Sequence, residues 1–475
     1  MSEDPELERA LARASDWVLH YFEDARAYSV LSQVEPGSVR RALPASPPER
    51  GEPLDALLDD FERLVLPGVT HWNHPRFFAY FGTSSSGPGV LAELLIAALN
   101  VNGMLWRTSP AATEVEEVAC DWLRQAIGLP EGFSGVINDT ASTSTLYALV
   151  AAREAAGLDA RRGGVDGRRL RYYASAEAHS SVEKAGLVMG TGSAGCVRIP
   201  VDAEFRMRPA ELAAAIARDR AHGLTPFAVV PTVGTTSTTS IDPVPEIAEI
   251  ARREGLWLHV DAAYGGAAAI LPSHRAVLAG CEHADSLVVN PHKWLFTPLD
   301  CSVLFCRREE VIRRAFSLVP DYLSNPEGDS VRNLMDFGTS LGRRFRGLKL
   351  WFVLRAFGLE RAREVLAGHL QMAQALRGWI EADPDFEILA PVPFSTVVFR
   401  HRGGDDANRA IEEAVNTSGV ALISHTTVGG AYVLRMAMGN LRTTEADVRA
   451  AWDAIRIAAA DQKVSSQTSS SNPTS

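Results

Sequence analysis

The apolar positions of the first 65 residues recur with a helical period and predict two amphipathic helices. Asp4-Pro5 is a favourable helix start, because a proline in the first turn has no N–H group to leave unpaired. The two apolar faces consist of Leu7, Leu11, Ala14, Val18 and Phe22, and of Leu54, Leu57, Leu58, Phe61, Leu64 and Val65. Residues 35–53 between them hold five prolines and are expected to form an irregular connection. Such helices have little core of their own, so we expect them to pack on another subunit or on the main body.

The middle of the chain alternates between short apolar runs and longer amphipathic segments. Strands are predicted at 135–139, 170–175, 196–202, 226–234, 256–263, 286–290 and 301–307. Helices are predicted between them at 142–157, 179–190, 209–223 and 243–255. This alternation predicts an α/β fold with a mostly parallel sheet covered on both faces. Functional residues are then expected at the carboxyl ends of the strands.

The last third of the chain has a different pattern. FRGLKLWFVLRAFG, after Arg344, predicts a helix, and short strands are predicted at 395–400 and 431–438. The predicted domains are an N-terminal helical segment at 1–84, a large α/β domain at 85–355 and a small C-terminal α+β domain at 356–463. Residues 464–475 are mostly polar and predict a disordered tail.

Composition narrows the class of protein. The 475 residues are 46% hydrophobic and 22% charged, which is typical of a globular chain with two or three domains. A net charge of −11 argues against general binding of nucleic acid or anionic membranes. The five cysteines form no CxxC pair, so we expect no disulfide framework or metal site, and a reducing cytoplasm. No signal peptide is recognisable, and the longest apolar run, 94–101, is too short to span a bilayer.

The sequence GTGSAG at 190–195 matches the dinucleotide-binding pattern G-x-G-x-x-G. That pattern requires a strand before it and a helix after it. Here a predicted helix precedes it and a predicted strand follows. We therefore interpret it as a helix C-cap and turn.

Two hydroxyl-rich segments follow predicted strands. DTAST, at 139–143, would begin a helix with backbone N–H groups and hydroxyl donors directed at an anion such as phosphate. Ordinary N-capping is the alternative, and it is the commoner use of such residues. VGTTS, at 233–237, is by itself a turn.

Two charged residues also follow apolar strands. Asp261, in HVDAAYGG, should lie deep, and a buried carboxylate is costly unless it is paired. It could also be a turn aspartate that accepts backbone hydrogen bonds. Lys293, in NPHKW, would become nucleophilic if partial burial lowered the pKa of its amine, whereas a lysine alone in this position would extend to solvent.

Together, a phosphate cradle, a buried carboxylate and an activated lysine are what pyridoxal 5'-phosphate requires. The lysine would form the Schiff base, the carboxylate would keep the pyridine nitrogen protonated, and the helix start would hold the phosphate.

The motifs HSSVEKAG, HVDAAYGG, NPHKW and LGRRFRGLKLWFVLR resemble the aromatic-L-amino-acid decarboxylases of the group II pyridoxal-phosphate-dependent decarboxylase family. The resemblance extends from about His71 to about Arg442. It implies fold type I, the aspartate aminotransferase-like fold, with 85–355 as the cofactor-binding domain. It also implies a homodimer that is clasped by 1–84 and has its active site at the interface.

The resemblance also implies residue roles. Lys293 resembles the Schiff-base lysine, Asp261 the partner of the pyridine nitrogen, and His179 the residue that stacks on the ring and touches substrate; a lone helix-start histidine is otherwise more often structural. The other matched positions are Ala141, Ser142, Asn290 and His292 at the phosphate, Thr236 at the cofactor and Thr83 at the substrate carboxylate.

The pocket and the catalytic loop are matched in the same way. Trp72, Tyr80 and Phe81 resemble a pocket wall suited to an aromatic ring, although core packing is an alternative, above all for Phe77 and Phe78. Gly342 resembles the small residue that leaves room for large rings. Gly82, Asn102 and Met104 depart from many relatives, which leaves the preference among tyrosine, dopa, phenylalanine and tryptophan open.

LVPDYLSNPEGD resembles the mobile catalytic loop, in which Tyr322 would help to protonate the product carbon; a plain surface tyrosine is the alternative. Relatives that make aldehydes often lack this tyrosine or the stacking histidine. With both residues present, the sequence predicts decarboxylation of an aromatic L-amino acid to its amine. Alternatives are an aromatic aldehyde synthase, a decarboxylase of another amino acid, another pyridoxal-phosphate enzyme or a non-enzymatic scaffold.

Overall fold

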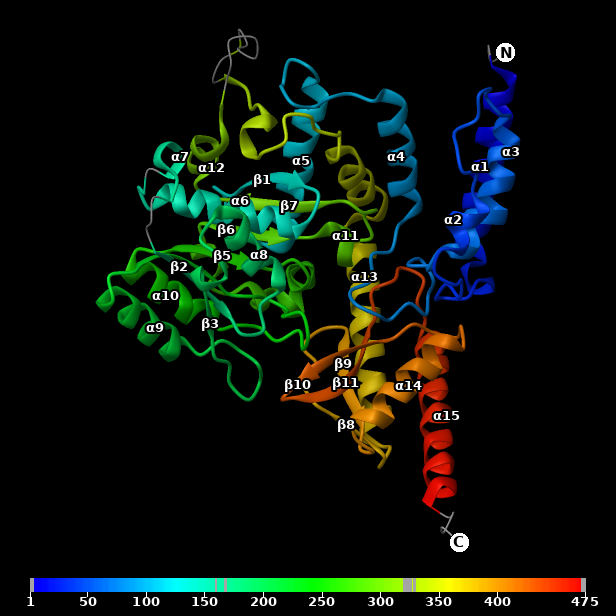
Figure 1. Cartoon of the computed structure of the whole chain (residues 1–475). Helices are drawn as coiled ribbons and strands as arrows, with labels where there is room; N and C mark the ends of the chain where they lie inside the picture. The colour runs from blue at the N-terminus through cyan, green and yellow to red at the C-terminus, as the bar shows by residue number, and fades with distance from the viewer. Residues whose placement is uncertain (1–3, 159, 166–168, 319–326, 328–329, 471–475) are drawn as a thin grey trace. The chain divides into compact units, whose positions relative to one another are not determined.

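The computed structural model describes residues 4–158, 160–165, 169–318, 327 and 330–470 (Figure 1). Its internal contacts divide the chain into two compact units. The first unit comprises Met1–Gly82, Leu376–Glu387 and Phe399–Ser475, and the second comprises Thr83–Ala375 and Ile388–Val398. The first unit therefore groups the N-terminal segment with most of the C-terminal part of the chain.

The helices and strands carry the labels of Figure 1. The helices are α1 Pro5–Glu23, α2 Ser38–Ala42, α3 Leu54–Asp60, α4 Gly87–Leu99, α5 Pro110–Ile127, α6 Ala141–Ala155, α7 Ala160–Gly163, α8 Ser180–Met189, α9 Pro209–Ala221, α10 Val244–Glu254, α11 Pro291–Trp294, α12 Glu309–Phe316, α13 Gly347–Glu381, α14 Asp405–Thr417 and α15 Glu445–Ser470. The strands are β1 Ser134–Asn138, β2 Leu170–Ser175, β3 Cys196–Ile199, β4 Thr225–Val230, β5 Trp257–Asp261, β6 Ser286–Val289, β7 Ser302–Cys306, β8 Phe386–Ile388, β9 Thr396–His401, β10 Ser424–Val428 and β11 Ala431–Ala437.

The N-terminal helices begin where the sequence predicts. The Asp4 carboxylate caps α1 by accepting hydrogen bonds from the N–H groups of Glu6 and Leu7, at 3.1 and 3.0 Å. The second predicted face is α3, which continues as a π-helical turn to Val65. The proline-rich connection is not wholly irregular, because it contains the short helix α2.

The second unit is built on a seven-stranded sheet with the order β1-β7-β6-β5-β4-β2-β3 (Figure 1). The pairs β2/β3, β2/β4, β4/β5 and β5/β6 are parallel, and β7 is antiparallel to both of its neighbours, β1 and β6. The predicted α/β fold with a mostly parallel sheet is confirmed. Because β7 is reversed relative to both neighbours, β1 runs in the same direction as β6.

One face of this sheet is buried under α6, α8 and α12. Ala148 and Ala152 of α6 belong to the same hydrophobic cluster as Tyr172 of β2, Trp257 of β5 and Ile312 of α12. The strands β5, β6 and β7 are buried along their whole length, as expected of strands that are covered on both faces. Burial on both sides fixes the strand register and so the position of each strand end.

A second sheet has the order β10-β11-β9-β8. The predicted strands at 395–400 and 431–438 are β9 and β11, whereas β8 and β10 were not predicted from the sequence. β8 has three residues, and β10 has the polar sequence SHTTV with exposed side chains, so neither carries a clear apolar alternation. The helix predicted after Arg344 is α13, which is broken at Gly358, where φ is +61° and ψ is 177°.

Two other features can be compared with the sequence. Gly190 ends α8 in the left-handed conformation, with φ +81°, so GTGSAG is a helix C-cap and turn as predicted. Where the sequence predicted a tail from residue 464, α15 continues to Ser470.

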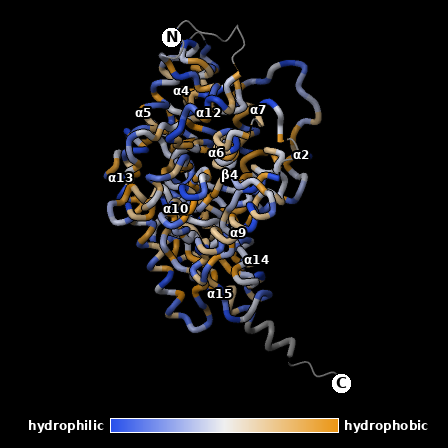
Figure 2. The backbone as a smooth tube through the Cα atoms, turned by 90° about the vertical axis from the view of Figure 1, so that its left-hand side faces the viewer, coloured by the Kyte–Doolittle hydropathy of each residue, from blue (hydrophilic) through white to orange (hydrophobic). Residues whose placement is uncertain are grey.

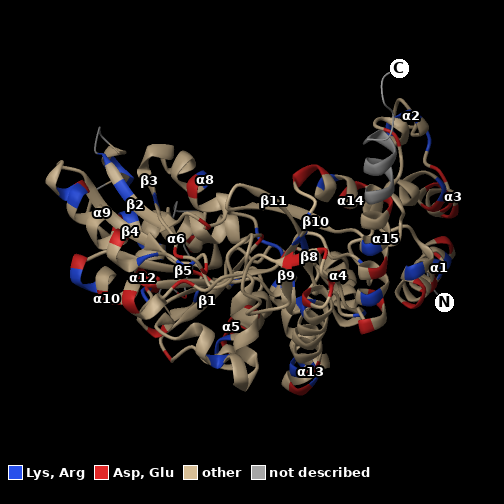
Figure 3. Cartoon of the chain, turned by 90° about the horizontal axis from the view of Figure 1, so that it is seen from below, with Lys and Arg blue, Asp and Glu red and all other residues tan. Residues whose placement is uncertain are grey.

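Hydrophilic and hydrophobic residues alternate over short distances along the backbone (Figure 2). Within the described part of the chain, no helix is long and apolar enough to cross a membrane. Acidic and basic residues are interspersed along the helices, as on α9, α10 and α12 (Figure 3). Charge of one sign is therefore not gathered on these helices.

Candidate active site

Strand direction brings the predicted site segments to one edge of the large sheet. The parallel strands β2, β4, β5 and β6 end on the same side, and β1, which runs with β6, ends there as well. Asp261 ends β5, and the segments beyond the other strand ends carry Asp139, His179, Thr236 and Asn290. Residues far apart in sequence thus meet at the carboxyl edge, which is where ligands bind in sheets of this type.

Lys293 lies in the single turn α11, directly after β6, and its side chain is half-buried. The next residue, Trp294, is fully buried and stacks on Tyr264 with ring centroids 4.9 Å apart. The Trp294 indole N–H donates to Nδ1 of His369 in α13, at 2.9 Å. This packing fixes the backbone on which Lys293 is mounted.

Lysine is scarce in this protein, with Lys184, Lys293, Lys349 and Lys463 as its only four lysines. Lys349 is fully buried, and its Nζ is engaged by Glu93 at 2.7 Å and by Asp300 at 3.6 Å. Lys184 is exposed on α8, and Lys463 belongs to α15 in the first unit. Within the second unit, Lys293 is therefore the lysine that combines partial burial with a place at the carboxyl edge.

Asp261 is the last residue of β5 and is buried. Its Oδ1 accepts a hydrogen bond from the N–H of Ala263 at 3.1 Å, as a turn aspartate would. His259 precedes it by two residues and so shares its face of the strand. Burial lowers the pKa of His259 to about 4, and the nearby Asp261 opposes this effect. A buried carboxylate in such surroundings calls for a cationic partner, which a protonated pyridine nitrogen would supply.

His179 is the N-cap residue of α8, the helix that follows β2. Desolvation by the surrounding protein lowers the pKa of His179, although the residue as a whole is exposed to solvent. The Asp261 charge raises that pKa and the Lys293 charge lowers it further, so both groups lie within electrostatic range of His179. The structure thus brings together the three residues that were predicted from separate motifs.

The start of α6 has the geometry of an anion site. Thr140 is the N-cap residue, and its hydroxyl accepts from the N–H of Thr143 at 3.5 Å. Ala141 and Ser142 occupy the first turn of this 15-residue helix, where N–H groups have no partner within the helix. Such N–H groups and the helix dipole favour a phosphate.

Asn290 and His292 add polar groups near the same edge. Oδ1 of Asn290 is buried and has no hydrogen-bond partner among the described residues. Turning the amide over would place the donor Nδ2 at this position, where a phosphate oxygen could accept from it. Nδ1 of His292 accepts from the N–H of Cys301 at 2.9 Å, and burial, with Lys293 nearby, lowers its pKa to about 3. His292 is thus a neutral imidazole with its hydrogen on Nε2, and both residues fit a bound phosphate.

Thr236 and Thr83 are accessible in the second unit. Thr236 is exposed in the turn after β4, which is closed by hydrogen bonds from the N–H groups of Gly234 and Thr235 to the carbonyl of Ser240, both at 3.0 Å. Thr83 is half-buried and precedes the serines that lead into α4. Both hydroxyl groups could reach a ligand.

The predicted pocket residues Asn102, Met104 and Gly342 are linked. The Asn102 side chain accepts from the N–H of Arg343 at 2.9 Å and donates to the sulfur of Met104 at 3.5 Å. Its polar atoms therefore hold the pocket segment together. A Cβ added to Gly342 would meet only Asn102, at 3.8 Å, so there is open space beside this glycine. Gly342 also lines a cavity of about 340 Å³ that reaches Asp139 at the start of α6.

Arg343 anchors the segment that carries Gly342. Its guanidinium lies 3.0 Å from the Glu116 carboxylate of α5, and both side chains are buried. Glu116 also accepts from the N–H of Ile137 in β1 at 2.9 Å. Because separating a buried ion pair is costly, this contact ties Gly342 to the sheet.

The remaining predicted pocket residues belong to the first unit or lie outside the described residues. Trp72, Tyr80 and Phe81 belong to the first unit, where Trp72 and Tyr80 stack with ring centroids 5.8 Å apart and Arg435 lies over the Phe81 ring at 4.4 Å. Phe77 and Phe78 are buried, so core packing is confirmed for them. Tyr322 lies outside the described residues.

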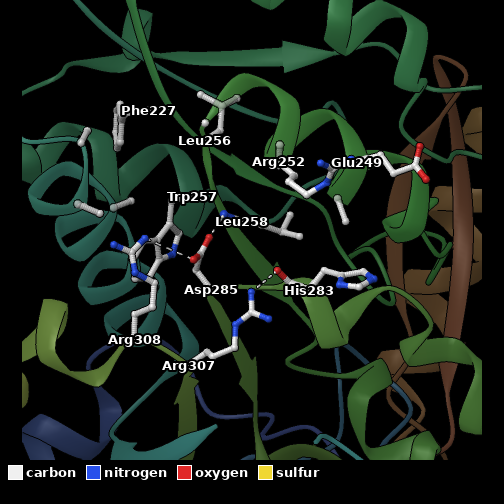
Figure 4. A pocket seen from close by; sticks show the side chains of 16 residues that line it. Phe227, Glu249, Arg252, Leu256, Trp257, Leu258, His283, Asp285, Arg307 and Arg308 are labelled. Atoms are coloured by element: carbon white, nitrogen blue, oxygen red, sulfur yellow. Dashed lines mark hydrogen bonds and ion pairs between the residues drawn. The ribbon is translucent and has the colours of Figure 1, made fainter. Parts of the chain in front are cut away.

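A second cavity, of about 570 Å³, lies at the opposite edge of the large sheet (Figure 4). Its lining includes Phe227 and Trp257, at the amino ends of β4 and β5, and Arg307 and Arg308, just after β7. Arg307 donates to the carbonyl of His283 at 2.7 Å, and Arg308 lies 3.6 Å from the Asp285 carboxylate. This cavity contains none of the predicted site residues.

The comparisons with known proteins bear directly on this geometry. Residues 36–402 match the model of the pyridoxal-dependent decarboxylase conserved domain. The chain belongs to the pyridoxal-dependent decarboxylase family. It is 40% identical to the aromatic-L-amino-acid decarboxylase of Bos taurus, with 94% of each chain covered, and 39% identical to the phenylacetaldehyde synthase of Arabidopsis thaliana, with 93% of each covered. A crystal structure of Oryza sativa TDC with PLP and tryptamine superposes with a TM-score of 0.94 at 37% identity, covering 97% of this chain and 99% of that one.

Membership of this family confirms the pyridoxal-phosphate cofactor and the carboxy-lyase class. It also confirms the resemblance on which the residue roles were transferred. The buried Asn290 amide, the neutral His292 and the start of α6 are consistent with that cofactor.

The sequence did not predict the residues that contact the site residues and hold them in place. Ser181 contacts the His179 ring, and Arg343 and Glu116 hold the Gly342 segment. The serine could have been suspected from HSS at a helix start, where a hydroxyl two residues after an N-cap can reach back to it. The Arg343–Glu116 pair joins positions 227 residues apart, and no local pattern signals it.

Replacing Asn290 with aspartate is expected to weaken pyridoxal-phosphate binding at least tenfold, because a buried carboxylate would face the phosphate. Asn290→Ala, which removes one hydrogen bond, should weaken binding by about fivefold. Equilibrium dialysis of the cofactor measures both. If the aspartate variant and the unaltered protein bind the cofactor with equal affinity, Asn290 does not contact the phosphate.

Proposed function

We propose that this decarboxylase converts an aromatic L-amino acid of the tyrosine, dopa, phenylalanine or tryptophan type to its amine and carbon dioxide. The observation that carries the proposal is the grouping of Lys293, Asp261 and His179 at the carboxyl edge of the sheet. Relatives that are about 40% identical over most of the chain and carry names of aromatic-amino-acid enzymes support the substrate class.

Pyridoxal phosphate, when bound, supplies an electron-withdrawing ring that accepts the bonding electrons of a departing carboxylate. Lys293 would hold the cofactor covalently and give way to the amino group of the substrate. Asp261 would keep a proton on the pyridine nitrogen, and His179 would pack on the ring face. Ala141, Ser142, Asn290 and His292 would hold the phosphate, with Thr236 beside the cofactor.

The substrate needs residues that orient its carboxylate and accept its ring. Thr83 would bind the carboxylate, and orientation decides which bond at Cα is broken. The space beside Gly342 supports an extended aromatic ring, with Asn102 and Met104 close by. By resemblance, Trp72, Tyr80 and Phe81 are further candidates for contact with the substrate. An aliphatic substrate would leave such a pocket poorly filled.

We further propose a cytoplasmic homodimer with the active site at the subunit interface. Leu91, Leu94, Leu95 and Leu99 of α4 are each at least 40% exposed, and an apolar surface of this kind favours a partner. All five cysteines are buried free thiols, which fits a reducing compartment. Sedimentation equilibrium should give twice the chain mass of 51.4 kDa. A species that stays at the single-chain mass across micromolar concentrations would contradict the dimer.

The reaction is tested by incubating the holoenzyme with the twenty amino acids and identifying the amines formed. Amines are expected from aromatic substrates only. Lys293→Ala should abolish turnover and also the covalent attachment of cofactor seen by mass spectrometry after borohydride reduction. Lys184→Ala is the matched control and should retain both. Amine formation from acidic or aliphatic amino acids alone would refute the aromatic assignment.

We assign to Tyr322 the protonation of the product carbon, which gives the amine and not the aldehyde. Replacing this tyrosine with phenylalanine removes the hydroxyl proton donor and is expected to divert product toward aldehyde. That route consumes dioxygen and water and releases hydrogen peroxide and ammonia in step with the aldehyde. A peroxide assay alongside carbon dioxide measurement gives the ratio. If Tyr322→Phe yields amine alone, as the unaltered enzyme is expected to do, the tyrosine has no part in this choice.

A further inference from the structure

The imidazole of His179 is tied to the helix that it caps. Nδ1 lies 3.1 Å from the backbone nitrogen of Ser181 and 2.8 Å from the Ser181 hydroxyl oxygen. Ser181 is 3% exposed, whereas the adjacent Ser180 is exposed. The buried Ser181 therefore contacts Nδ1 of His179 through both its backbone nitrogen and its hydroxyl oxygen.

These contacts determine where the ring carries its hydrogen. The backbone N–H of Ser181 can only donate, so Nδ1 must accept and carries no hydrogen of its own. The neutral ring then has its hydrogen on Nε2, the nitrogen that does not face the helix start. Placing a proton on Nδ1 would direct it at the Ser181 N–H and break the helix cap.

The hydroxyl does more than capping requires. Any residue other than proline at position 181 would supply the backbone N–H, so the cap by itself does not need a serine. The hydroxyl has one hydrogen to donate, and the Nδ1 lone pair is its nearest partner in the structure. A second donor on Nδ1 stabilises the neutral ring and limits its rotation.

We propose that Ser181 is a positioning residue that holds His179 in the neutral form with the hydrogen on Nε2, ready to donate to substrate. The proposal rests on the proposed function, in which His179 packs on the cofactor ring and meets substrate. Ser181 would then influence the reaction through the His179 ring, without a catalytic role of its own.

The charges around His179 are consistent with a neutral ring. Burial is the main cause that lowers its pKa, and Lys293, Lys184 of α8 and Arg198 of β3 lower it further. Among the groups with the largest effects, Asp261 of β5 is the one that raises this pKa. Arg198 donates to the carbonyls of Ser175 and Ala178, each at 3.2 Å, and pairs with the Glu183 carboxylate of α8 at 3.2 Å, so its side chain is fixed beside the start of α8.

The direct test is the pKa of His179 in the holoenzyme, measured by hydrogen–deuterium exchange at the ring C2 position with mass spectrometry. Ser181→Ala removes a donor to the neutral ring and should raise this pKa by about half a unit to one unit. Ser181→Thr keeps the hydroxyl and should restore the value, and Ser180→Ala should leave it unchanged. Ser181→Cys, which keeps the size but donates weakly, should fall between serine and alanine if threonine disturbs the packing.

Turnover gives a second readout. The acidic limb of the kcat–pH profile should move upward in Ser181→Ala by the same amount as the pKa. At the optimum, kcat should fall about fivefold with little change in KM, because one hydrogen bond that orients the ring is lost. Ser181→Thr should recover most of the loss.

An unchanged or lower pKa in Ser181→Ala would overturn the proposal, because the hydroxyl would then stabilise the charged ring or neither form. An equal shift in Ser180→Ala would do the same, since it would point to a general effect on the helix. The exchange measurement requires no substrate, so it remains decisive even if the aromatic substrate assignment fails.

Discussion

The direction of the strands is the constraint on which the candidate site depends. β2, β4, β5 and β6 are parallel, and β1 runs with them because the reversed β7 lies between β1 and β6. Five connections therefore leave the sheet at one edge, and each can place a residue there without long excursions of the chain. Burial of the strands fixes their register, so the residues that follow them are held to the tolerance that covalent catalysis requires.

Burial then determines the charge of the groups gathered at this edge. The imidazoles of His179, His259 and His292 all have lowered pKa values, chiefly because the protein removes water from around them. Neutral imidazoles can orient and donate hydrogen bonds without competing for the anionic groups of a phosphorylated cofactor. The carboxylate of Asp261 is then expected to pair with the cofactor, and the positive charges that act on His179 come from Lys293, Lys184 and Arg198.

The sequence was sufficient for the features that have a local signal. Apolar runs alternating with amphipathic segments predicted all seven strands of the large sheet, and the position of Lys293 and Asp261 just beyond them followed. β10 was not predicted, because its side chains are polar and its stability comes from pairing with β11. The contact between Trp294 and His369 and that between Arg343 and Glu116 depend on tertiary packing and leave no periodic trace. The pocket residues Trp72, Tyr80 and Phe81 were matched by resemblance, and their local packing in the first unit does not by itself define a pocket.

The grouping of Lys293 with Asp261 does not decide which bond of the substrate is broken, because an aminotransferase or another lyase that uses this cofactor can share the same pair. What distinguishes a decarboxylase is the set of contacts that orient the substrate and control protons near Cα. In this protein those contacts begin at the helix cap of α8, where Ser181 engages the ring that is expected to face the substrate. Reaction choice can therefore depend on a hydrogen bond from a serine that is not itself one of the groups expected to react.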